Sequence, residues 1–199
     1  MNRQCILRRP EEALTSAIPR FAYCRRGQLA AIPLVAATIC CWHEYENEPV
    51  IWGTAGVVFA IGVALRIWSQ QHLRFRLRTK MNLTVTGPYA LVRNPIYIAN
   101  TLICIALTLA SEVLWLLPVT ILTCAIVYTL AVRHEEGKLV EQYGDAYVGY
   151  QRRVSRWVPR WPNGLKPRWT RDYLRASLAG EAHNLLFIIP LLLKELLSR

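Results

Sequence analysis

The sequence predicts an all-α integral membrane protein with about five transmembrane or membrane-associated helices. Hydrophobic residues make up 53% of the 199-residue chain, yet the formal net charge is +11. The mean hydropathy of +0.20 is too high for an ordinary soluble domain. These properties fit one chain because apolar and basic residues occupy alternating segments, which is typical of helices that cross a bilayer.

Four apolar runs give the expected helices in order, at 29–42, 49–68, 96–110 and 113–132. The second and fourth are long enough to cross about 30 Å of hydrocarbon at roughly 1.5 Å per residue, whereas the first and third need flanking residues to do so. A fifth run, 182–197, contains charged residues and a proline. It could span, lie in the interface or pack on the other helices, and we favour spanning.

The basic residues predict the orientation of these helices. They lie before the first run, between the second and third, and after the fourth. The other two connections contain no Lys or Arg and instead hold Glu44, Glu46 and Glu48 in one and Glu112 in the other. Lys and Arg are retained on the cytoplasmic side, so the N-terminus is expected to be cytoplasmic. Nucleic-acid binding is the alternative explanation of a pI near 9.8. The alternation with apolar runs favours a membrane partner and no nucleic acid.

The cysteines predict neither a metal centre nor disulfides. They show no paired ligand spacing, and most lie within or beside apolar runs, where a buried thiol acts as a small hydrophobic group. They are Cys5, Cys24, Cys40, Cys41, Cys104 and Cys124.

A polar cluster at 86–97 stands directly before the third apolar run. Asn94 suits the N-cap of a helix and Pro95 suits its first position. A helix entrance alone does not explain the arginine and tyrosines crowded around this pair. Free N–H groups at a helix N-terminus favour a carboxylate or phosphate ligand, and Arg93 would reinforce that preference.

A second polar cluster, Glu135 and Glu136, follows the fourth run and either ends or interrupts that helix. Adjacent carboxylates near a helix C-terminus are unfavourable, so a positive group is expected close by. Two candidates remain open: pairing with Arg133, Lys138 or the basic tail, and a cationic or hydroxyl-rich ligand. Since the two apolar runs between the clusters form a hairpin, both clusters should lie on one side of the bilayer.

Tyrosines follow the glutamates at the helical spacing of Tyr143, Tyr147 and Tyr150. Packing against the membrane interface or a neighbouring helix is the favoured interpretation of such a stripe. The alternative is a lid over a pocket formed by the two clusters.

Together these segments resemble the isoprenylcysteine carboxyl methyltransferases and the related phospholipid methyltransferases. The likeness consists of G-x-Y-x-x-x-R-[HN]-P-x-Y at 87–97, E-E-x-x-L-x-x-x-[FY]-G-x-x-Y-x-x-Y at 135–150, and Val-Pro-Arg at 158–160. It covers about residues 66–160. Each motif alone is loose, but their order across a helical hairpin is fairly specific.

The resemblance implies an integral membrane enzyme that binds S-adenosylmethionine in a cytoplasmic pocket at the end of the third and fourth helices. The catalytic residues expected from it are Tyr97, Arg133 and Glu135. The expected cofactor-binding residues are Met81, Asn82, Leu83, Thr84, Tyr89, Arg93, Asn94, Pro95, Ile96, Tyr97, Glu135 and Glu136.

Two departures from the family pattern bear on the acceptor. Asn94 replaces a histidine found in many members, so no imidazole base acts there. Ala131 stands where the carboxyl methyltransferases have an arginine, which removes a partner for a carboxylate substrate unless Arg133 substitutes. We therefore favour an amine, phenol or phospholipid headgroup on an apolar body, with prenylcysteine carboxylate still open. An NADPH-dependent reductase of the sterol reductase type and a non-enzymatic scaffold are the rival functions.

The expected organisation has four parts. A basic cytoplasmic segment, 1–28, precedes two transmembrane helices at 29–68, and the methyltransferase core occupies 69–160. The C-terminal segment 161–199 carries the fifth run. The expected partners are the membrane and a lipophilic small molecule or lipid substrate.

Overall fold

The computed structural model describes residues 10–39, 48–78, 83–160, 174–175 and 177–178. Within these residues the regular structure is entirely helical, as predicted. The elements are α1 (Pro10–Ile39), α2 (Glu48–Arg78), α3 (Pro88–Leu91), α4 (Pro95–Ala110), the 3-10 helix η1 (Leu114–Leu116), α5 (Leu117–Tyr143) and α6 (Asp145–Arg153).

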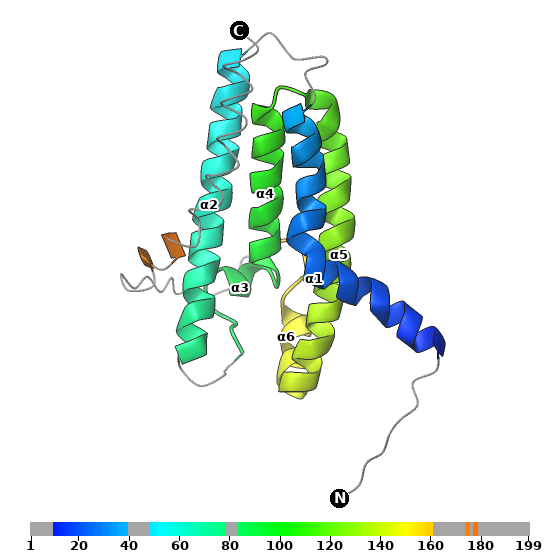
Figure 1. The fold of residues 1–199 in the computed structure, drawn as a ribbon. Helices are drawn as coiled ribbons and strands as arrows, with labels where there is room; N and C mark the ends of the chain where they lie inside the picture. The colour runs from blue at the N-terminus through cyan, green and yellow to red at the C-terminus, as the bar shows by residue number, and fades with distance from the viewer. Residues whose placement is uncertain (1–9, 40–47, 79–82, 161–173, 176, 179–199) are drawn as a thin grey trace, which may run out of the picture.

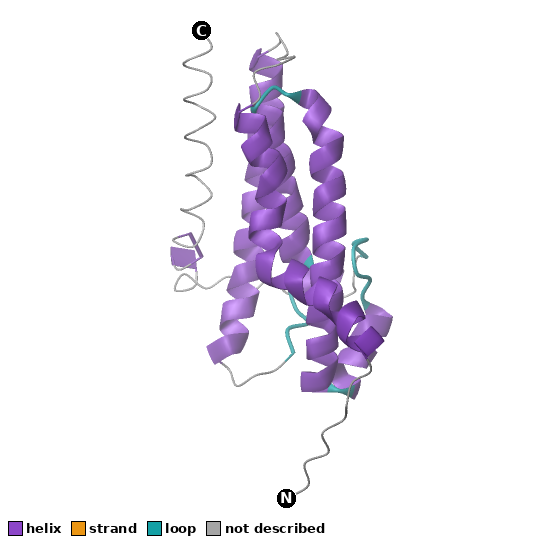
Figure 2. Cartoon of the chain, turned by 45° about the vertical axis from the view of Figure 1, so that its right-hand side comes forward, coloured by secondary structure: helices purple, strands orange, loops and turns teal. Residues whose placement is uncertain are grey.

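Four long helices, α1, α2, α4 and α5, run side by side (Figure 1). A tight turn joins α4 to α5 at one end, and the short helices α3 and α6 lie at the opposite end. Helix α2 packs along α4, and α1 packs along α5. Figure 2 shows the described loops gathered at the two ends of this bundle. The end that carries α3 and α6 therefore brings the two polar clusters of the sequence together.

Two helical segments, Pro49–Leu73 and Leu114–Tyr143, are long and apolar enough to cross a membrane. They contain the run 49–68 and all but the first residue of the run 113–132, which confirms these two expected spans by length and composition. Helix α4 has 16 residues, so spanning by α4 stays a prediction, as does the cytoplasmic orientation. The run 182–197 lies outside the described residues.

Two helices extend further than hydropathy predicts. Helix α1 begins at Pro10 and contains Pro19 and Pro33, so much of the basic segment 1–28 is helical. Its polar part packs on the polar C-terminal extension of α5, where the Tyr23 ring lies 5.3 Å from that of His134. Helix α5 continues through both glutamates to Tyr143. Such extensions are polar and owe their helical state to tertiary packing, which hydropathy does not detect.

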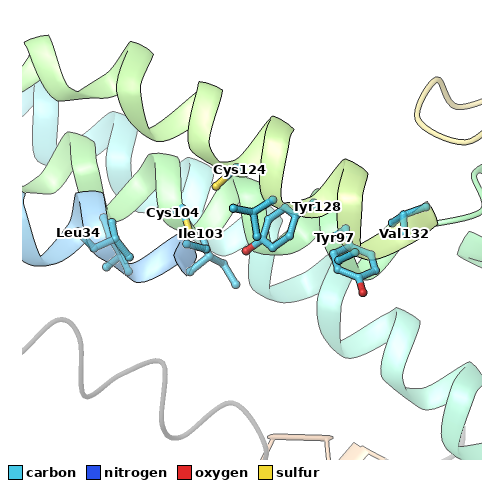
Figure 3. Packing of buried hydrophobic residues seen from close by; sticks show 11 residues of the cluster. Leu34, Tyr97, Ile103, Cys104, Cys124, Tyr128 and Val132 are labelled. Atoms are coloured by element: carbon cyan, nitrogen blue, oxygen red, sulfur yellow. The ribbon is translucent and has the colours of Figure 1, made fainter. Parts of the chain in front are cut away.

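Small residues and a polar contact hold the helices together. A side chain at Gly62 of α2 would meet Ile103 and the Ala99 carbonyl of α4 within 3.2 Å, so glycine permits this close approach. Between α4 and α5, the buried hydroxyls of Thr108 and Thr120 hydrogen bond at 3.0 Å. Beside this contact lies an apolar core with several of its side chains shown in Figure 3, including Leu34, Tyr97, Ile103, Cys104, Cys124, Tyr128 and Val132.

Candidate active site

A strained glycine turn leads into α3 and fixes the first polar cluster to α2. Gly87 has φ 63° and ψ −135°, a conformation that is essentially restricted to glycine. The buried ring of His72 fills the space beside it, and a Cβ atom at residue 87 would lie 2.4 Å from that ring. His72 Nδ1 also lies within hydrogen-bond distance of the Thr86 hydroxyl, at 3.2 Å. The turn is therefore positioned by the end of α2.

Asn94 occupies the N-cap position of α4, and Pro95 occupies the first helical position, as predicted. The side chain of Asn94 does not cap the helix, however. Its amide instead donates to the carbonyl oxygen of Arg156 at 3.4 Å. The expectation of a side-chain cap was wrong because a later segment of the chain competes for the same amide.

That later segment, 154–160, forms a strap across the entrance to α4. The Arg93 amide donates to the Ser155 carbonyl, and the Arg160 amide donates to the Leu91 carbonyl, each at 3.0 Å. Together with the Asn94 contact, these bonds attach the strap to both sides of the α3–α4 junction. The strap includes the Val-Pro-Arg sequence at 158–160.

Glu136 is the buried anchor of this arrangement. Its side chain is only 6% exposed and pairs with Arg93 at 3.3 Å and with Arg156 at 2.6 Å. Arg156 Nε also donates to the Glu136 carboxylate at 3.2 Å, so the contact between these two side chains is bidentate. The hydrogen bond to Glu136 raises the pKa of Arg156, so this guanidinium stays protonated. The partners of Glu136 are thus Arg93 and an arginine of the basic tail.

Glu135, the residue before Glu136 on α5, has a different environment. It is half-buried and accepts a hydrogen bond from the Tyr97 hydroxyl, with an O–O distance of 2.8 Å. The Tyr97 ring packs against Tyr128, with centroids 5.2 Å apart (Figure 3). Because the Tyr97 proton is directed at the carboxylate, Tyr97 orients Glu135.

The tyrosine stripe is broken at Gly144, which has φ 53° and separates α5 from α6. Tyr147 and Tyr150 are buried on α6, and the Tyr150 hydroxyl donates to the Tyr89 carbonyl at 2.6 Å. Burial raises the pKa of Tyr147 to about 12, so its hydroxyl stays protonated at neutral pH. The expected continuous helical spacing is wrong for Tyr143, which belongs to the preceding helix.

These elements enclose a cavity of about 540 Å³. One end is polar and aromatic, with Glu135 and the tyrosines of α3, α4 and α6, and the other end is mainly aliphatic. The lining residues are Arg26, Gly27, Ala30, Ala31, Leu34, Arg66, Leu73, Leu83, Thr84, Tyr89, Arg93, Asn94, Pro95, Ile96, Tyr97, Asn100, Ile103, Cys104, Leu107, Tyr128, Glu135, Leu139, Tyr147 and Tyr150.

The structure brings most of the expected site residues to this cavity. Those in its lining are Leu83, Thr84, Tyr89, Arg93, Asn94, Pro95, Ile96, Tyr97 and Glu135. Glu136 lies behind the wall in its ion pairs, and Arg133 is exposed and outside the lining. Met81 and Asn82 lie outside the described residues. The catalytic and cofactor-binding roles assigned from the sequence stay predictions.

Sequence reasoning missed three polar lining residues, Arg26, Arg66 and Asn100. Arg66 and Asn100 lie within the expected membrane runs, and an ionisable or strongly polar side chain in such a run is a signal of a functional site. Arg26 gave no such signal, because it is one of several arginines before the first run. Only the packing of α1 on α5 places it at the cavity.

The chain is similar to two heavy-metal resistance proteins. The chain is 25% identical over 133 residues to the nickel-cobalt-cadmium resistance protein NccN of Alcaligenes xylosoxydans xylosoxydans, covering 65% of this chain and 61% of that protein. It is 32% identical over 120 residues to the cobalt-zinc-cadmium resistance protein CzcN of Cupriavidus metallidurans, covering 60% and 54%. The match thus spans less than two thirds of the length of either relative.

No solved structure matches the chain. The family described as phospholipid methyltransferase matches residues 49–146. This segment includes α2, the α3–α4 junction, the α4–α5 hairpin and both glutamates. Residues 49–146 are therefore similar to the phospholipid methyltransferase family, in agreement with the resemblance seen in the sequence.

Proposed function

We propose that the protein transfers a methyl group from S-adenosylmethionine to a lipophilic acceptor at the cytoplasmic membrane face. The observation that carries the proposal is the cavity at the end of the α4–α5 hairpin. It gathers eight residues expected to bind the cofactor around a ninth, the carboxylate Glu135. The family match to residues 49–146 supports methyl transfer as the reaction.

The lining residues suit the chemistry of the methyl donor. A half-buried carboxylate at Glu135 is complementary to an ammonium group or to ribose hydroxyls. The tyrosine rings at residues 89, 147 and 150 offer aromatic surface for an adenine. A volume of about 540 Å³ lies within the range of roughly 300–1,000 Å³ found for small-molecule sites.

The donor, when bound, supplies an electrophilic methyl group on a sulfonium. The chain then has to align the acceptor with that methyl group and exclude water. Tyr97 contributes by fixing the orientation of Glu135 through the 2.8 Å hydrogen bond. Asn94 does not titrate, so it cannot act as a base; it lines the cavity as a residue expected to bind the cofactor, and its amide also holds the strap.

The aliphatic end of the cavity suits the hydrophobic body of an acceptor. Leu34, Ile103 and Leu107 line it from α1 and α4, where they belong to the bundle interior. Burial of hydrocarbon against such side chains contributes roughly 25 cal/mol per Å². A lipid tail in this part of the cavity would leave its polar group near the tyrosines.

The first test compares ligands with the full-length protein in detergent. S-adenosylhomocysteine should raise the melting temperature, whereas NADPH should not, because a ligand stabilises only the protein that binds it. Stabilisation by NADPH alone would favour the reductase class. Transfer of a labelled methyl group into lipid extracts is the corresponding activity measurement.

The second test assigns the role of Glu135. Glu135→Ala should weaken S-adenosylhomocysteine binding by about tenfold or more while the protein still inserts and folds. Glu141→Ala is the matched control, since Glu141 is exposed on the same helix and outside the lining. Equal affinities for the two variants by calorimetry would remove Glu135 from the cofactor site.

A further inference from the structure

Helix α1 forms one wall of the cavity, although it lies before the family-matched segment 49–146. It contributes Arg26 at the polar end and the face Gly27, Ala30, Ala31 and Leu34 along the aliphatic part. These residues recur at helical spacing and turn one side of α1 toward the site. The wall opposite includes Arg66 and Leu73 of α2. The family match therefore covers only part of the lining.

Arg26 is held in place mainly by aromatic rings. Its guanidinium carbon lies 4.4 Å from the centroid of the Tyr23 ring and 5.7 Å from that of Tyr97. Among the residues that the structure describes, its one side-chain hydrogen bond is a long contact of 3.5 Å to the Tyr23 carbonyl. A guanidinium has five N–H donors, and within the described residues Arg26 forms no ion pair with a carboxylate. The stacking thus orients a cation beside the Tyr97–Glu135 pair and leaves donors for a ligand.

The balance of charge in the cavity favours an anionic ligand. Arg26, Arg66 and Arg93 line it together with one carboxylate, Glu135. Glu136 neutralises Arg93 from behind the wall. The methyl donor carries two positive groups and one carboxylate, so its binding adds further positive charge. A net positive site that excludes water is stabilised by an anion in contact with its cations.

We propose that Arg26 binds the anionic group of the methyl acceptor, a lipid phosphodiester or carboxylate, while the Gly27–Leu34 face of α1 contacts its hydrocarbon chain. This inference rests on the proposed methyl transfer. Arg26 and Glu135 then divide the polar end between acceptor and donor. The guanidinium fork matches both oxyanions, because each presents two oxygens to parallel N–H donors. Arg26 thus determines which acceptor binds. When the acceptor is a phosphodiester, the anionic group held by Arg26 is not the atom that receives the methyl group.

The test measures lipid binding to the full-length protein in detergent with saturating S-adenosylhomocysteine. Three ligands share one oleoyl chain: lysophosphatidylglycerol carries a phosphodiester, oleate a carboxylate, and monooleoylglycerol no charge. Arg26→Gln should weaken binding of at least one anionic ligand by about tenfold or more and leave monooleoylglycerol unchanged. The ligand that loses most affinity identifies the anion as phosphodiester or carboxylate.

Arg25→Gln is the matched control, because it removes the same charge from the neighbouring residue. Arg25 is exposed, bonds to Gln28 at 2.7 Å and lies outside the cavity lining. It should bind all three lipids as the parent protein does. Arg26→Lys keeps the charge but not the fork, and should retain part of the anionic preference. A melting temperature near that of the parent shows that the variants are folded.

Unchanged binding of both anionic lipids by Arg26→Gln would overturn the inference. So would equal losses in Arg25→Gln and Arg26→Gln, which would indicate a general surface charge effect. Loss of S-adenosylhomocysteine affinity without loss of lipid affinity would place Arg26 in the donor site and also overturn it. Failure of the parent protein to bind S-adenosylhomocysteine would instead refute the proposed function, and lipid titrations without nucleoside would still report on Arg26.

Discussion

Replacing Glu136 with glutamine should destabilise the fold while leaving the cavity-facing carboxylate of Glu135 in place. The two glutamates have different environments, although they are adjacent in sequence: Glu136 is held in ion pairs and Glu135 faces the cavity. Glu136 is 6% exposed at its side chain and neutralises Arg93, which is 10% exposed, together with Arg156. Glutamine removes the charge and one of the two acceptor oxygens. Two guanidinium groups then lose their shared counterion.

Breaking a buried ion pair by removing one partner costs about 3–5 kcal/mol. Part of this cost is recovered here, because Arg156 is 34% exposed and water solvates it, and because the remaining amide oxygen still accepts a hydrogen bond. We expect Glu136→Gln to lower the free energy of unfolding by about 2–4 kcal/mol, mainly because the buried Arg93 loses its counterion. For a chain of this length, 1 kcal/mol corresponds to roughly 2–4 °C in melting temperature.

The assay is the melting temperature in one detergent, read by intrinsic tryptophan fluorescence, combined with S-adenosylhomocysteine affinity at a temperature where each variant is folded. Glu136→Gln should melt well below the parent protein. Glu135→Gln should melt close to it but bind the nucleoside more weakly. Equal melting temperatures for the two variants would falsify the division of roles between Glu135 and Glu136.

Two further substitutions test the positioning of the site. Tyr97→Phe removes the 2.8 Å hydrogen bond to Glu135. It should weaken S-adenosylhomocysteine binding by about threefold to tenfold in calorimetry and lower the melting temperature by no more than a few degrees. An affinity equal to that of the parent protein would argue against orientation of the Glu135 carboxylate by Tyr97. Gly87→Ala places a Cβ atom 2.4 Å from the His72 ring at φ 63°, and should cost about 2–4 kcal/mol in thermal unfolding. Gly149→Ala is its control, because nothing lies within 4 Å of a Cβ atom there, and equal stabilities of these two variants would contradict the account of the turn.

Hydropathy predicted the parts of the fold that a bilayer dictates. The run 49–68 lies within α2, and the run 113–132, apart from its first residue, lies within η1 and α5. A bilayer requires a minimum apolar length, and that length can be read directly from the sequence. Hydropathy did not predict the start of α1 at Pro10 or the continuation of α5 to Tyr143. There the residues are polar, and contacts between α1 and α5 decide the helical state.

In the site, too, some contacts follow from neighbouring residues in the sequence and others depend on distant segments. Local signals placed Pro95 at the first position of α4 and gathered Tyr97 and Glu135 at one end of the hairpin. Whether Asn94 caps its own helix or bonds to Arg156 depends on a segment 62 residues away. The arrival of Arg26 from α1 likewise depends on helix packing. No short-range pattern contains either contact.

The strap at 154–160 has a consequence for a chain that is still being synthesised. Its backbone bonds to Arg93 and Leu91, and its Arg156 completes the ion pairs of Glu136. All three partners are translated before the strap leaves the ribosome. The α4–α5 hairpin can thus form while the end of the bundle that carries the cavity is still unfinished. Emergence of residues 154–160 then adds the contacts that hold the entrance to α4, so this end of the bundle is completed only after the hairpin has been synthesised.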